Sequence, residues 1–143
     1  MASSSADFTM NRAALRSASA GNPVDAMSPA RMIVALYERL TLDLGRARQS
    51  LESDDRATAH DCMLHAQDIV AALYDSLDIR TWHAARRLKL VYLFLLFELV
   101  AANVDMDALR LASCCELIAP LYDAWHEVAG IVPSAAARGA SAP

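Results

Sequence analysis

The segment LKLVYLFLLFELVAANV, residues 88–104, is the most apolar run of the chain, and Glu98 is its one carboxylate. On a helical wheel, at about 100° per residue, its apolar side chains divide into two stripes on nearly opposite faces. A helix that is apolar all round has to be covered all round, so the fold depends on what covers each stripe. The first stripe consists of Leu88, Val91, Tyr92, Leu95, Leu99 and Ala102, and the second of Leu90, Leu93, Phe97, Val100 and Val104.

Three environments could cover the second stripe. A bilayer-spanning helix needs about 20 apolar residues, whereas the run from Leu90 to Val104 is shorter and contains Glu98, so we expect no membrane span. A strand is excluded because the helical period persists over too long a run. The wheel leaves two alternatives open: a helix buried fully in one core, or a bundle helix with its first stripe in the core and its second on a partner.

Composition indicates a small helical protein. The 143 residues suffice for one domain with a single core, and 55% of them are hydrophobic while only 4 are glycine, which favours helices. The formal net charge of −4 argues against a nucleic-acid partner, which needs a clustered basic surface. Cys62, Cys114 and Cys115 form no disulfide framework, and the start MASSSADFTMNR lacks an apolar signal region, so we expect a cytoplasmic protein.

The apolar periodicity predicts four helices, at residues 29–51, 55–77, 81–104 and from about 107 to beyond 125. Ser28-Pro29 is a strong helix start, Asp105-Met106-Asp107 offers an N-cap to the last helix, and Pro120 is expected to kink that helix. Short connections make an antiparallel four-helix bundle the expected all-α fold. We expect a flexible N-terminal segment (1–27), the bundle (28–130) and a disordered C-terminal tail (131–143).

No motif indicates an enzyme. His60, Cys62 and His65 are close in sequence, but His60 and His65 lie about 140° apart on a helix and no fourth ligand is placed by spacing, so zinc is not expected. Cys114 and Cys115 point to different faces of a helix. We therefore expect no catalytic residue, no metal site and no cofactor. The basic first turns of the third helix, with Arg80, Arg86, Arg87 and Lys89, form either a solvated rim or a contact for an acidic partner.

The ordered motifs of the chain resemble those of the FliS family, the cytoplasmic chaperones for flagellin export. Met27-Ser28-Pro29, followed by Ile33, Leu36 and Tyr37, resembles the opening of that family, and Leu121, Ala124 and Trp125 resemble the end of its fourth helix. The likeness extends from about Met27 to Val128. Between these ends lie Ala66-Gln67-Asp68-Ile69-Val70 with Ser76-Leu77-Asp78, and the third-helix pattern of Leu88, Tyr92, Leu99, Ala102 and Asn103.

This resemblance implies an antiparallel helical bundle without enzymatic activity. It implies that the client is the disordered C-terminal region of flagellin, which folds into helices as it wraps around the bundle. It also implies an N-terminal segment that occupies part of the client surface, and contact with the flagellar export gate.

The chain departs from the family pattern at three places. Residues 1–27 contain no tyrosine, and Arg80-Thr81-Trp82-His83 replaces a glycine-rich connection. Positions 93 and 97, usually charged in the family, are Leu93 and Phe97. The second stripe is therefore a feature of this chain, and we expect the client, the N-terminal segment or a second copy in a homodimer to cover it.

The leading hypothesis is a chaperone that binds flagellin, prevents its premature polymerisation and assists its export. The alternative is a generic homodimeric helical adaptor that binds an amphipathic partner helix. The residues expected to bind the partner are Ile69, Leu90, Leu93, Phe97, Val100 and Asn103.

Overall fold

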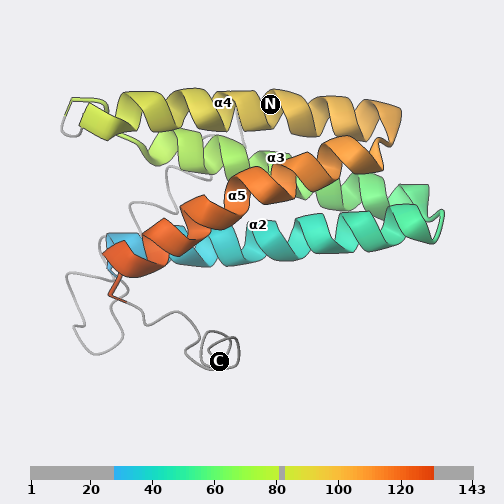
Figure 1. Cartoon of the computed structure of the whole chain (residues 1–143), viewed down its shortest axis with the longest axis horizontal. Helices are drawn as coiled ribbons and strands as arrows, with labels where there is room; N and C mark the ends of the chain where they lie inside the picture. Colours follow the sequence, from blue (N-terminus) through green and yellow to red (C-terminus); the bar gives the residue numbers. More distant parts are fainter. Residues whose placement is uncertain (1–27, 81–82, 131–143) are drawn as a thin grey trace, which may run out of the picture.

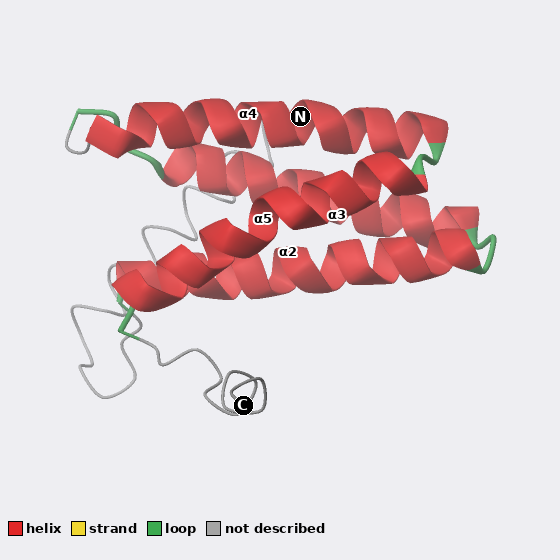
Figure 2. Cartoon of the chain, viewed as in Figure 1, coloured by secondary structure: helices red, strands yellow, loops and turns green. Residues whose placement is uncertain are grey.

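The computed structural model describes residues 28–80 and 83–130, and every regular element in these two ranges is an α-helix. The helices are α2 (Pro29–Glu52), α3 (Arg56–Ser76), α4 (His83–Asp105) and α5 (Ala108–Val128), joined by short connections (Figure 2). The predicted all-α four-helix bundle is confirmed, and each observed boundary within the described ranges lies within a few residues of its prediction. The segments expected to be flexible, 1–27 and 131–143, lie outside the described residues.

Side-chain caps begin three of the helices. The Ser28 hydroxyl accepts a hydrogen bond from the backbone N–H of Arg31 (3.2 Å) at the start of α2. Asp55 caps α3 and Asp107 caps α5 in the same way. A cap gives a hydrogen-bond partner to an N–H group in the first turn that the helix itself leaves without one. The three capping side chains therefore determine where these helices begin. Asp54 and Met106, which precede two of the caps, adopt positive φ angles of 59° and 50° and turn the chain tightly.

The four helices form an antiparallel ring in which each contacts two neighbours: α2 packs on α3, α3 on α4, α4 on α5, and α5 on α2. Figure 1 shows that α5 runs obliquely, from the end of α4 towards the start of α2. It continues as one helix across Pro120, and the kink expected there stays a prediction.

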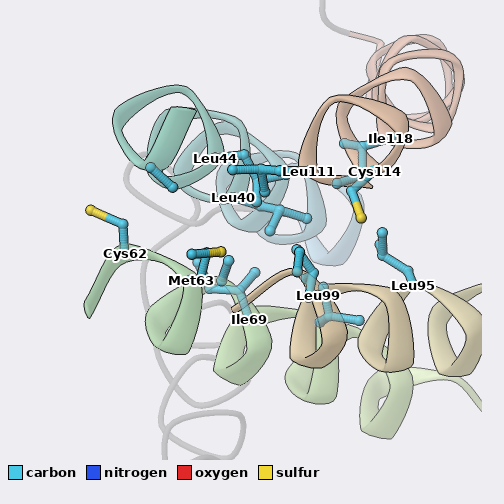
Figure 3. Close-up of a cluster of buried hydrophobic side chains, with 14 of the residues drawn as sticks. Leu40, Leu44, Cys62, Met63, Ile69, Leu95, Leu99, Leu111, Cys114 and Ile118 are labelled. Carbon is cyan, nitrogen blue, oxygen red and sulfur yellow. The ribbon is translucent and has the colours of Figure 1, made fainter. Parts of the chain in front are cut away.

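All four helices contribute to one core. Its largest fully buried side chains include Tyr37, Leu40 and Leu44 of α2, and Figure 3 shows leucines of α2 and α4 facing one another across it. The hydroxyl groups of Tyr37 and Tyr92 share a buried hydrogen bond of 2.6 Å. Among the described residues, no helix is long and apolar enough to cross a bilayer.

Candidate partner-binding surface

Helix α4 has one buried and one exposed apolar face. Of the first stripe, Tyr92, Leu95, Leu99 and Ala102 are buried in the core, and Leu88 and Val91 are half-buried. All five members of the second stripe are exposed; the side chain of Phe97 has 66% of its surface in contact with solvent and that of Leu93 has 38%. The alternative in which α4 is buried on all sides is therefore wrong, and the second stripe is a surface feature.

The position of α4 in the ring explains this exposure. Its neighbours are α3 and α5, and both lie on the core side of the helix. On the α5 side, Arg110 forms an ion pair with Glu98 (Nη1 to Oε1, 3.8 Å). On the α3 side, Lys89 Nζ lies 4.5 Å from the ring centroid of Tyr74. These contacts occupy the two flanks of α4, and none of the other helices in the described ranges packs against its outward face.

Phe94 also belongs to this surface, although the wheel analysis assigned it to neither stripe. It is 58% exposed. The signal was present in the sequence, because Phe94 lies four residues after Leu90 and residues four apart share a helix face. We define the outer stripe of α4 as the exposed apolar residues Leu90, Leu93, Phe94, Phe97, Val100 and Val104.

Leu64 of α3 extends this surface towards the neighbouring helix. His60 Nδ1 lies 2.8 Å from Asn103 Oδ1, and this contact fixes the antiparallel register of α3 and α4. About one helical turn from this contact, towards the C-terminus of α3 and the N-terminus of α4, lie Leu64 and Val100, and both are exposed. The two side chains therefore lie at the same level beside the α3–α4 contact.

Two of the residues expected to bind the partner are buried and do not lie on the outer stripe. Ile69 is 6% exposed and belongs to the core (Figure 3). Asn103 is 7% exposed, and its side-chain oxygen is held by His60. Because a buried side chain offers a partner little surface, these two residues position the helices that carry the surface. The other four expected residues, Leu90, Leu93, Phe97 and Val100, lie together on the exposed face of α4.

Charged residues border the outer stripe at both ends. Arg86 and Arg87 are exposed near the start of α4, and Asp105 is exposed at its end. The stripe is thus apolar along its length, basic at its N-terminal end and acidic at its C-terminal end.

The polar residues singled out in the sequence have structural partners. His60 contacts Asn103, and His65 contacts the buried carboxylate of Asp43 on α2. Burial raises the pKa of the Cys114 thiol to about 12, which keeps it protonated and unreactive at neutral pH. Within the described ranges, no group of three or more histidine, cysteine, aspartate or glutamate side chains is arranged to hold a metal ion.

An exposed apolar helix face on a helical bundle is a candidate site for binding another polypeptide segment. The family model for the flagellar protein FliS matches residues 10–132 of this chain. The chain therefore belongs to the FliS family, a family of flagellar export chaperones. A search of curated protein sequences found no significant match.

Proposed function

We propose that the protein is a cytoplasmic chaperone that binds the C-terminal region of flagellin through the outer stripe of α4, preventing premature polymerisation and assisting export. The observation that carries the proposal is the exposure of Phe97 and its neighbours on a helix that also supplies the core. An amphipathic client helix could lay its apolar face along this stripe, as in other helix-in-groove complexes. Membership of the FliS family supports flagellin as the client.

The size of the stripe limits what one client helix can contribute. Fully burying a large apolar side chain yields about 1.5–3 kcal/mol, and the six residues of the stripe are already partly covered, so together they supply roughly 5–10 kcal/mol. Association costs about 4–15 kcal/mol, and ordering a disordered client adds roughly 2–5 kcal/mol. Useful affinity therefore requires a client that contacts more than α4, and the exposed Leu64 is one place where the contact could continue onto α3.

Calorimetric titration with the isolated C-terminal region of the cognate flagellin tests the proposal. We expect a 1:1 complex with the wild-type chain, and at least about 100-fold weaker binding for the double variant Leu93→Asp/Phe97→Asp, because two carboxylates would be desolvated in the contact. Leu42→Asp is the matched control: Leu42 is exposed on α2, which is not adjacent to α4. Absence of binding by the wild-type chain would reject the proposal.

A further inference from the structure

Helix α3 carries two exposed aspartates beside the outer stripe of α4. Asp61 and Asp68 are seven residues apart, so they lie on one face of the helix, about two turns from each other. On a wheel of α3, His60 marks the side towards α4 and His65 the side towards α2, because their side chains contact those helices. Asp61 and Asp68 fall between these two directions, on the face turned away from the core, and we call them the acidic row. Leu64 lies between the acidic row and the outer stripe.

The acidic row follows the outer stripe level by level. Helices α3 and α4 pack side by side (Figure 1). One contact near each end of the pair, the histidine–asparagine contact and the lysine–tyrosine contact, gives the same antiparallel register. In this register Asp68 lies at a level between Leu93 and Phe97, and Asp61 lies just beyond Val100. The two carboxylates therefore border the half of the stripe that runs from the middle of α4 to its end.

The stability of the bundle does not explain the acidic row. From Ala57 to Ile79 the chain contains no lysine or arginine. The histidine within one turn of both aspartates, His65, contacts Asp43 of α2 instead. Within the described ranges, no ion pair includes Asp61 or Asp68. Aspartate is also a weak helix former in a helix interior, so neither residue has a function within α3 itself.

From this arrangement we propose that the outer stripe and the acidic row together select a partner helix whose edge facing α3 carries lysine or arginine. The apolar side of such a helix covers the outer stripe and Leu64, and cations seven residues apart on its edge meet Asp68 and Asp61. Flanking charges select partners in coiled coils in the same way. The inference rests on the proposed function, because the stripe has to bind a helix, and it adds which helices are bound.

The other end of α4 limits where the partner needs its cations. Arg86 and Arg87 are exposed there, at the level of the last residues of α3, so the bundle supplies its own cations at that end. A partner helix with lysine or arginine along its whole edge would meet these arginines as like charges. The basic residues of the partner are therefore expected over about two turns beside the acidic row, and not beside the start of α4.

Two designed peptides of about three heptads test this selection. Both carry leucine at the two seam positions of each heptad; one has lysine and the other has glutamate at a single flanking position in the two heptads that face the acidic row. Fluorescence anisotropy measures their binding to the full chain. We expect the lysine peptide to bind about tenfold more tightly, because two ion pairs replace two like-charge contacts. In about 0.5 M salt this preference should shrink, since the Debye length falls to about 4 Å.

A charge-neutral variant tests the residues. Asp61→Asn/Asp68→Asn should abolish most of the preference for the lysine peptide while leaving the seam intact. Glu116→Gln/Glu127→Gln is the matched control: it removes the same charge from exposed positions of α5, which is not adjacent to α3, and should keep the preference. Circular dichroism establishes that both variants are folded.

Zero-length carbodiimide coupling gives a readout that does not depend on affinity. It joins a lysine amine to a carboxylate that lies in direct contact with it. We expect the lysine peptide to be coupled to Asp61 or Asp68, as mapped by mass spectrometry of proteolytic fragments, and not to Glu116 or Glu127.

Four results would overturn the inference: no binding of the lysine peptide, equal binding of the two peptides, an equal loss of preference in the α5 control, or coupling to α5 alone. If the peptides behave as expected and the flagellin region does not bind, the proposed function alone fails. If flagellin binds through the outer stripe with an affinity that Asp61→Asn/Asp68→Asn leaves unchanged, the charge selection alone fails.

Discussion

The hydroxyl oxygens of Tyr37 and Tyr92 lie 2.6 Å apart in the core and connect α2 with α4, two helices that are not neighbours in the ring. Each tyrosine belongs to one of the motifs on which the family resemblance rests. Their ring centroids are 6.4 Å apart, and the ring of Tyr122 on α5 lies 6.1 Å from that of Tyr37. Two of the motifs that carry the family resemblance, those of α2 and α4, therefore meet in the core and help to hold these helices together.

Removing both hydroxyl groups should cost less stability than the sum of removing each one alone. Tyr37→Phe leaves the Tyr92 hydroxyl buried with a lost partner, and we expect a loss of about 1–3 kcal/mol in the free energy of unfolding. The double variant Tyr37→Phe/Tyr92→Phe should lose less than the sum of the single variants. Urea denaturation of the four proteins measures this coupling, and strictly additive losses would show that the hydroxyl contact contributes no energy of its own.

The bundle should lose stability at alkaline pH. Burial raises the pKa of both Tyr37 and Tyr92 above the ordinary tyrosine value of about 10. In the unfolded chain both hydroxyl groups would ionise near pH 10, whereas in the folded chain they stay neutral. Their contribution to the free energy of unfolding is therefore fully present below that pH and is lost as the pH rises above it. The free energy of unfolding should therefore fall above pH 10, and less steeply in Tyr37→Phe/Tyr92→Phe. An equally steep fall in the double variant would contradict this assignment.

Leu95 and Phe97 are two residues apart on α4 and should respond oppositely to truncation. Leu95 is fully buried, so Leu95→Ala should lower the free energy of unfolding by about 2–5 kcal/mol. Phe97 is 66% exposed, and Phe97→Ala should change it by no more than about 0.5 kcal/mol. The comparison should be made at low protein concentration, where self-association does not add to stability. A large loss in Phe97→Ala under these conditions would mean that the same chain covers this side chain.

Gly45 offers a stabilising substitution. It lies exposed within α2, and a Cβ atom added there would meet no other atom within 4 Å. Gly45→Ala should therefore raise the free energy of unfolding by about 0.5–1 kcal/mol, because alanine restricts the unfolded chain and favours the helix. Gly130 is the contrasting control: its φ angle of +67° disfavours any side chain, so Gly130→Ala should not stabilise. Thermal unfolding of both variants measures the difference.

Asp43 should be the most sensitive charged residue of the α2–α3 contact. Its side chain is 3% exposed. The carboxylate contacts His65 of α3 and lies 3.5 Å from Arg39 Nε. We expect Asp43→Asn to cost about 1–3 kcal/mol, because it weakens charge-assisted hydrogen bonds in a buried position. Arg39→Gln, at the exposed end of the ion pair, should cost less than about 1 kcal/mol. Chemical denaturation compares the two, and equal losses would contradict the dominant role given to Asp43.

Local chemistry made much of the fold readable from the sequence. Ser28-Pro29 marks the start of the first helix, and Asp55 and Asp107 supply N-caps, because capping depends on residues only three positions apart. The division of the α4 segment into two apolar stripes also followed from periodicity alone, and the structure confirms it: Tyr92, Leu95 and Leu99 are buried while Phe97 is exposed.

The tertiary structure decided whether the second stripe is buried or exposed, and which residues the surface contains. Periodicity left both arrangements of α4 open, and the positions of α3 and α5 decided between them. The same packing buries Ile69 and lets His60 hold Asn103, which periodicity cannot show, because these contacts join residues far apart in the chain. The sequence by itself determined four helices, one of which carries a surplus of apolar surface. Only the arrangement of the neighbouring helices left the second stripe exposed, because a side chain is buried only where other residues pack against it.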